Sequence, residues 1–353
     1  MFKEEKEMKR LLLLLCCLTL ALPVLGAAEE EKVLNLFTWE LYVDDQTIAD
    51  FEAETGIKVI YSTFDTNENM IAKLQLGGGG DYDVIIASDY AVNIVRKAGL
   101  LEKLDKSLIT RYDTLDPVLL SPYFDPDNEY SVPYMSGTPL IVYNPAYVDI
   151  EITGYESLWD ESLRDNVVVM DDARNIIGIT LKTMGYSFNT TDDDVLAQAA
   201  EKLAKLRPNI RAFNSETPYM DLASGECAVG YMYGQYASVC LQENPELQVV
   251  YPEEGVGFGI DSLVIPQGAK HPENAHRFID FLLKPEIAAQ TAQAQPFRSP
   301  VPAASEFLSQ AFLDDPAINI PSQLLENAEF IMDLGDYETK YQNIWTDFKL
   351  LNQ

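Results

Sequence analysis

The side chains that usually carry enzymatic or metal chemistry are scarce in this chain. Its 353 residues include only two histidines, His271 and His276. Histidine is the commonest base for serine or cysteine nucleophiles and a frequent zinc ligand. We find no nucleophile beside a base and no pair of carboxylates suited to acid–base catalysis. The sequence therefore predicts no enzymatic activity, no cofactor and no metal centre.

Aromatic and acidic side chains instead gather at the ends of predicted strands, where loops commonly carry binding groups. They are Trp39 and Tyr42 after Val33–Thr38, Ser88 and Tyr90 after Val84–Ala87, Asp172 after Val167–Met170, Tyr233 at the end of Ala228–Tyr233, and Asp261 before Ser262–Ile265. Each contact of a cation with an aromatic face contributes about 0.5–2 kcal/mol. Carboxylates form strong charge-assisted hydrogen bonds with protonated nitrogens. This set of residues suits the binding of an organic cation.

The composition is that of a folded, strongly acidic protein. Hydrophobic residues make up 47% and charged residues 23% of the chain, which is ordinary for a globular protein. The formal net charge is −31, from 25 Lys and Arg against 56 Asp and Glu. Such a surface repels phosphate backbones and attracts cations. Nucleic acid is therefore not an expected partner.

Residues 1–28 have the layout of a secretory signal peptide. Lys9 and Arg10 precede the apolar run Leu11–Leu22, and the small residues Gly26–Ala28 follow it. This pattern predicts cleavage after residue 28 and an exported protein, periplasmic or associated with the cell surface. An uncleaved anchor helix is the alternative.

Two cysteines follow the signal segment, Cys227 and Cys240. Oxidising conditions outside the membrane permit a disulfide between them. The alternative is a pair of buried free thiols, and the sequence does not place their Cα atoms within bonding range.

Strands and helices alternate along the chain. After the first strand we expect helices over Asp44–Thr55, Asn67–Leu76 and Tyr90–Ala98, strands over Ile57–Ser62 and Pro139–Tyr143, further helices over Ala173–Met184, Val195–Leu206, Gln235–Leu241 and Pro272–Leu283, a strand over Gln248–Tyr251, and a helical tail over Gln323–Leu334 and Tyr337–Leu350. This order predicts an α/β fold with mostly parallel sheets covered by helices. No linker divides the chain, so we expect two lobes that the chain crosses more than once.

Several segments together resemble the substrate-binding proteins of bacterial spermidine/putrescine ABC importers, and the likeness covers nearly the whole chain after the signal segment. They are Phe37–Val43, Phe51–Phe64, Tyr82–Tyr90, Met170–Arg174, Leu206–Ile210 and Asp261–Pro266. The resemblance implies a periplasmic-binding-protein-like (type II) α/β fold with a ligand cleft between two lobes. It also implies a monomeric receptor that captures putrescine or spermidine and delivers it to a membrane permease.

The resemblance also implies the lobes and the site. Lobe one would comprise residues 33–135 and 262–301, and lobe two residues 136–261 and 302–353. Trp39, Tyr42, Tyr90, Tyr233 and Phe297 would form the aromatic walls. Ser88 would be a polar contact, and Asp172 and Asp261 would bind the ammonium groups. Asp172 is also an expected N-cap whose second oxygen stays free for a ligand, and Arg174 an expected ion-pair partner.

Some positions depart from the pattern of the family's spermidine binders. Asn175 stands where they usually have Glu, and Gly259 stands where they have Trp. Glu40 lies one position before the expected acid and would compensate for a lost carboxylate or remain solvated. These departures favour putrescine or another short cation over spermidine. The alternatives are a receptor for another organic cation, such as an agmatine-like or choline-like molecule, and a ferric-iron receptor built on tyrosine and acid ligands.

Overall fold

The computed structural model describes residues 31–325 and 328–351. The predicted signal peptide, residues 1–28, lies outside the described residues, so its cleavage stays a prediction. No helix in the described part of the chain is both long and apolar enough to cross a membrane.

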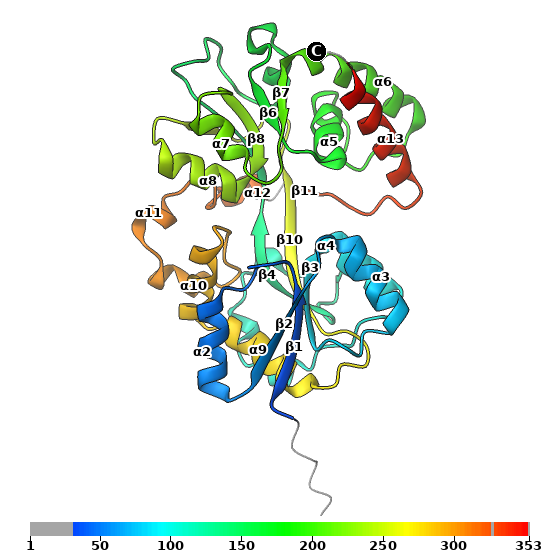
Figure 1. Cartoon of the computed structure of the whole chain (residues 1–353), viewed down its shortest axis with the longest axis vertical. Coiled ribbons are helices and arrows are strands. Elements are labelled where there is room, and N and C mark those ends of the chain that lie inside the picture. Colours follow the sequence, from blue (N-terminus) through cyan, green and yellow to red (C-terminus); the bar gives the residue numbers. More distant parts are fainter. Residues whose placement is uncertain (1–30, 326–327, 352–353) are drawn as a thin grey trace, which may run out of the picture. The chain divides into compact units, whose positions relative to one another are not determined.

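The first of two sheets is partly parallel (Figure 1). Its strands are β1 (Val33–Thr38), β2 (Lys58–Thr63), β3 (Val84–Ser88), β4 (Ser131–Gly137), β10 (Gly257–Val264) and β11 (Glu329–Phe330). The order is β11-β10-β3-β1-β2, and β4 pairs with β10. β1 runs parallel to β2 and β3, as the alternation of strands and helices predicts. β10 runs antiparallel to β3 and β4, so its residues lie beside the end of β3.

The second sheet also combines parallel and antiparallel strands. Its strands are β5 (Pro139–Tyr143), β6 (Val167–Val169), β7 (Ile210–Phe213), β8 (Val229–Tyr233) and β9 (Gln248–Val250). The order is β7-β6-β8-β5-β9. β6 is parallel to β7 and β8, whereas β5 is antiparallel to β8 and β9.

Helices cover both sheets, as Figure 1 shows. Those around the first sheet are α2 (Asp45–Thr55), α3 (Asn67–Gly77), α4 (Asp89–Lys97), α9 (Pro272–Leu282) and α10 (Pro285–Ala294). Those around the second are α5 (Ala173–Thr183), α6 (Asp193–Ala204), α7 (Pro218–Ala223), α8 (Gly234–Glu243) and α13 (Tyr337–Leu350). Two short helices, α11 (Gln310–Leu313) and α12 (Ser322–Leu325), lie in the segment between α10 and β11.

Local signals set the limits of α2. The Oδ1 of Asp44 accepts a hydrogen bond of 3.0 Å from the backbone N–H of Thr47 and caps the first turn. Gly56 ends the helix with φ +69°, a left-handed conformation that glycine adopts without steric cost. Between these ends, Phe51 packs edge-to-face on Phe278 with ring centroids 5.0 Å apart. This contact fixes α2 against α9 in the core of the first sheet.

The chain crosses between the sheets more than once, as expected. It leaves the first sheet at the end of β4, enters the second at β5 and returns through β10. We expected lobe two to resume at residue 302, but Ala304 and Leu308 pack in the core cluster of the first sheet. We therefore propose that the return to lobe two starts after Leu308. The limits after residues 135 and 261 stay proposals, and they fall inside β4 and β10, two strands of the first sheet.

The helix expected over residues 323–334 is wrong in its second half. α12 ends at Leu325, and β11 pairs in parallel with the start of β10. Phe330 packs against Phe258 and Tyr123, with ring centroids 5.5 and 5.3 Å apart. This pairing and these ring contacts hold the segment in an extended conformation.

The two cysteines are free thiols. Cys227 and Cys240 are both buried and unbridged. Burial raises the pKa of each thiol to about 12, so both stay protonated at neutral pH. They therefore act as small buried side chains, which confirms the second of the two alternatives.

Candidate functional site

Residues at strand ends of both sheets line one cavity of about 1220 Å³. All the expected ligand-binding residues line it except Glu40: these are Trp39, Tyr42, Ser88, Tyr90, Asp172, Asn175, Tyr233, Asp261 and Phe297. Most of these residues lie at or just after the carboxyl end of a strand, so they gather at one edge of each sheet. The structure therefore brings together side chains that are up to 258 positions apart in the chain, from Trp39 to Phe297.

An aromatic wall lies at the end of β1. Trp39 and Tyr42 meet edge-to-face with ring centroids 4.9 Å apart. Phe297, which follows α10, also meets Tyr42 edge-to-face, with ring centroids 6.3 Å apart. These edge-to-face contacts orient the rings and stabilise the wall. Its aromatic faces suit both the methylene groups and the positive charge of an alkyl cation.

Asp261 holds a carboxylate against this wall. The Tyr42 hydroxyl donates a hydrogen bond to its Oδ2, and β10 places it directly opposite Ser88 of β3. Burial raises the pKa of this carboxyl, and hydrogen bonds from Tyr42 and Ser88 offset part of the rise. Burial, followed by the charge of Asp261, raises the pKa of Tyr42 well above its usual value. Tyr42 therefore remains a hydrogen-bond donor at neutral pH.

Tyr90 stands at the start of α4, beside Ser88. Its hydroxyl accepts a hydrogen bond of 3.1 Å from Asn67 Nδ2 and donates one of 3.0 Å to Glu68 Oε1. The same Asn67 amide donates to Ser88 Oγ at 3.2 Å. This network orients the Tyr90 ring, and it adds Glu68 to the acids of the cavity.

Asp172 lies across the cavity, at the start of α5. Its Oδ1 accepts the Asn175 backbone N–H at 2.9 Å, which confirms the expected N-cap. Its Oδ2 accepts hydrogen bonds from Asn175 Nδ2 at 2.8 Å and from the Tyr233 hydroxyl at 3.2 Å. The expectation of a free second oxygen is therefore wrong, because two neutral donors already contact it. A cation at this site would join them as a further donor.

Glu40 does not lie with the other residues. Its side chain is exposed, and it does not line the cavity. Leu41 has φ +58°, and the backbone N–H of Tyr42 reaches back to the carbonyl of Trp39 at 3.4 Å. This tight turn directs Trp39 and Tyr42 into the cavity and leaves Glu40 outside it.

Sequence reasoning missed Asp89, which lines the cavity between Ser88 and Tyr90. Its acidic character within the Ser88-Asp89-Tyr90 segment was the available signal. The sequence did not indicate that Asp89 is buried, because its burial depends on β10 packing beside β3. Burial, followed by the charge of Asp261, raises the pKa of Asp89 to about 8.

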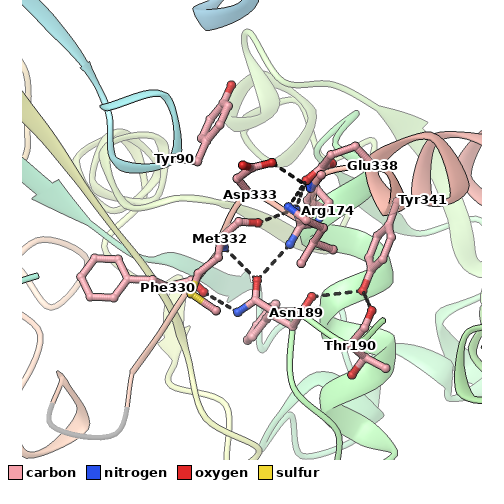
Figure 2. A network of polar contacts seen from close by, with 12 residues as sticks. Tyr90, Arg174, Asn189, Thr190, Phe330, Met332, Asp333, Glu338 and Tyr341 are labelled. Atoms are coloured by element: carbon pink, nitrogen blue, oxygen red, sulfur yellow. Dashed lines mark hydrogen bonds and ion pairs between the residues drawn. The ribbon is translucent and has the colours of Figure 1, made fainter. Parts of the chain in front are cut away.

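Arg174 forms the expected ion pair and ties the C-terminal segment to α5 (Figure 2). It pairs with Glu338 of α13, and it donates hydrogen bonds to Met332 O at 2.8 Å and Asn189 Oδ1 at 3.0 Å. Its guanidinium carbon lies 4.9 Å from the centroid of the Tyr341 ring. The network thereby positions Met332, which lines the cavity, and compensates the charge of Arg174.

We expect Arg174→Met to lower the free energy of unfolding by about 2–3 kcal/mol, because the substitution leaves several partly buried polar partners without a donor. Urea denaturation of the purified protein measures the loss. Arg211→Met is the matched control, since Arg211 pairs with Asp165 but its side chain is 39% exposed, against 12% for Arg174. We expect the control to lose less than about 1 kcal/mol. Equal losses in the two variants would contradict a structural role for the network.

Comparison with known proteins places the chain in a family. The family model described as bacterial extracellular solute-binding protein matches residues 46–320. The chain belongs to this family. Its fold is that of the two-lobed periplasmic binding proteins, as the solved structure described below also shows.

Within the family, the chain is similar to polyamine-binding members. It is 39% identical over 322 residues to the spermidine/putrescine-binding periplasmic protein of Salmonella typhimurium, covering 90% of this chain and 92% of that protein. It is 37% identical over 323 residues to the protein of the same name from Escherichia coli, with coverage of 91% and 93%. The structure of a spermidine/putrescine ABC transporter substrate-binding protein from Streptococcus pneumoniae, bound to calcium and HEPES, matches with a TM-score of 0.81 and 34% identity. That match covers 90% of this chain and 98% of that one.

Proposed function

We propose that this protein is an exported receptor that captures a short polyamine in the cavity and delivers it to the membrane permease of an ABC importer. One observation carries the proposal: an acid is hydrogen-bonded to a tyrosine on each side of the cavity, Asp261 with Tyr42 and Asp172 with Tyr233. A diamine is protonated at both ends at neutral pH, so each ammonium group takes one carboxylate. The aromatic rings between them suit the alkyl chain.

The charges of the cavity support a cationic ligand. The acids that line it are Glu68, Asp89, Asp171, Asp172, Asp261, Asp333 and Glu338, whereas the cations are Arg174 and Lys349. Both cations are paired, Arg174 with Glu338 and Lys349 with Asp171. The remaining acids leave an excess of negative charge, which raises the local concentration of a cation.

The relatives support the same class of ligand. A putrescine-binding periplasmic protein of Pseudomonas aeruginosa is 33% identical, and one of Escherichia coli is 31% identical. The names of these relatives also support a periplasmic or cell-surface location. We further propose that the receptor acts as a monomer, binds no nucleic acid and catalyses no reaction.

Calorimetry of the purified protein against putrescine, spermidine, spermine and choline tests the proposed function. We expect putrescine to bind with the heat and stoichiometry of one site per chain. Choline is expected to bind weakly, since its quaternary nitrogen has no N–H group for Asp172 or Asp261. If none of the amines binds, the proposed function is wrong.

The ferric-iron alternative predicts a visible absorption band on titration of the protein with ferric iron. Among the described residues, no group of three or more His, Cys, Asp or Glu is placed to hold a metal ion.

We expect the wild type to bind putrescine more tightly than spermidine, by roughly 10- to 100-fold. Asn175 is buried, and its amide faces Asp172, so it offers the internal ammonium group of spermidine no neutralising charge. An unpaired buried cation is heavily penalised. Asn175→Glu is expected to move the affinity ratio at least about 10-fold towards spermidine. Asn175→Gln, which lengthens the side chain without adding charge, is the control. A wild type that already prefers spermidine would refute this explanation.

A further inference from the structure

A second carboxylate lies beside Asp261 in the wall of the cavity. Asp89 is the first residue of α4, and its side chain is only 5% exposed. Its Oδ1 accepts a hydrogen bond of 2.6 Å from the backbone N–H of Tyr90. Within the described residues, no cationic side chain forms an ion pair with Asp89 or with Asp261. Both residues thus line the cavity without a positively charged partner.

An open space adjoins Asp89. Gly259 lies on β10 two residues before Asp261, so the two positions face the same side of the strand. A β-carbon at Gly259 would lie 3.8 Å from Asp89 Oδ2 and would meet no other atom within 4 Å outside its chain neighbours. Gly259 itself lines the cavity. A ligand can therefore reach the space next to Asp89 Oδ2. This space is larger than it would be if position 259 carried a side chain.

We propose that Asp89, Asp261 and the space at Gly259 form a subsite for a guanidinium group, so that the preferred ligand is an alkyl chain with an ammonium group at one end and a guanidinium group at the other. This inference rests on the proposed function, because it assigns one end of the ligand within the same cavity. A guanidinium group is planar and presents N–H donors along more than one edge, so it bridges two neighbouring carboxylates. An ammonium group is a compact point charge that suits one carboxylate.

The opposite end of the cavity differs in the way this assignment requires. At this end the neighbouring acid Asp171 is neutralised by an ion pair with Lys349. Asn175 and Tyr233 already donate to the Oδ2 of Asp172. That leaves room for one compact donor, as an ammonium group provides. The two ends of the cavity are therefore chemically unequal, and a ligand with two unequal ends fits them better than a symmetric diamine.

The charge state of Asp89 is consistent with this role. Burial and the charge of Asp261 raise its pKa to about 8, so in the empty cavity it carries a proton at neutral pH. A bound guanidinium group supplies the positive charge that favours ionisation of Asp89. Binding of such a ligand should then release a proton and become tighter as the pH rises from 6 to 8. The groups that face Asp89 are Asp261, the Tyr90 and Ile260 backbone N–H groups, and the Tyr123 hydroxyl.

Calorimetry with putrescine and agmatine tests the proposal, since the two share a four-carbon chain and differ in one end group. We expect wild type to bind agmatine about 10-fold more tightly than putrescine. Asp89→Asn keeps an oxygen for the Tyr90 N–H and removes the charge. It should weaken agmatine about 10- to 100-fold and putrescine by a clearly smaller factor. Asp65→Asn, at an exposed acid in the loop between β2 and α3, is the matched control.

A second variant tests the space rather than the charge. Gly259→Val fills the gap beside Asp89 and should weaken agmatine selectively, whether or not Asp89→Asn folds. The inference is overturned if wild type binds putrescine at least as tightly as agmatine, or if both variants weaken the two ligands equally. If wild type binds neither amine, the proposed function fails and the subsite fails with it. Binding of putrescine without preference for agmatine overturns the subsite alone.

Discussion

Replacing Asp261 by Asn is expected to weaken the binding of putrescine by about 100-fold or more. Asp261 lines the cavity, accepts a hydrogen bond from Tyr42 and lies opposite Ser88. Its carboxylate is largely removed from water, which is why its pKa is raised. Removing one partner of a buried ion pair costs about 3–5 kcal/mol, since the other charge stays desolvated without compensation. That free energy corresponds to a loss of affinity of more than about 100-fold.

Titration calorimetry of Asp261→Asn with putrescine measures this loss. Asn has nearly the same shape and still accepts the hydrogen bond from Tyr42, so the fold should be retained, and thermal unfolding checks this. Asp127→Asn, at an exposed acid of the same lobe, controls for the general loss of negative charge. We expect the control to change affinity by less than about 2-fold, because its charge is screened by solvent. An affinity within about 5-fold of wild type in Asp261→Asn would exclude this residue as the ammonium partner.

The second large effect concerns stability of the empty protein as a function of pH. The pKa of Asp89 is raised to about 8 in the folded protein from the ordinary aspartate value of 3.8. Between these two values the folded state holds a proton that the unfolded state has released. Raising the pH through this window therefore lowers the free energy of unfolding, by about 1.4 kcal/mol per pH unit for one proton. Below pH 4 both states are protonated, and the contribution of this group no longer changes.

Asp89→Asn should remove this decrease in the free energy of unfolding with rising pH. Urea denaturation at pH 5, 6 and 7 in wild type and variant gives the difference. We expect the variant to gain about 1.4 kcal/mol per pH unit relative to wild type. The carboxyls with lowered pKa, such as Glu52 and Asp193, act in the opposite sense and cancel in this comparison, because both proteins contain them. Parallel pH profiles in wild type and Asp89→Asn would show that Asp89 is ionised in the empty protein.

Much of the cavity was predictable from local pattern. Trp39, Tyr42, Ser88 and Tyr90 lie at the ends of two apolar runs, β1 and β3, which are parallel neighbours although α2, β2 and α3 lie between them in the chain. The carboxyl ends of parallel strands meet at one edge of a sheet, so side chains that follow them come together. Asp172 was predictable for a second reason, since a short acidic side chain before an apolar helical run caps that helix. These inferences need only the hydrophobic periodicity of the helices and strands and the direction in which the strands run.

Other features depend on contacts that no local pattern encodes. Glu40 was expected near the ligand, but the turn at Leu41 leaves it in solvent. The second oxygen of Asp172 was expected to be free, yet Tyr233, 61 positions away, donates to it. The residues 329–330 fit a helical pattern and form β11, because β10 offers them a free strand edge.

The sequence by itself determined the class of fold, the family and most of the residues at the cavity edge. Only the tertiary structure decided that Asp89 and Asp261 are neighbours, and that the space at Gly259 opens beside them. β10 reaches Ser88 by antiparallel pairing across 173 positions, from Ser88 to Asp261. Whether two carboxylates end up close and buried depends on which strand edges pair and on what covers them. These are long-range contacts, so the pKa of Asp89 and the chemistry it implies follow from packing rather than from residue type.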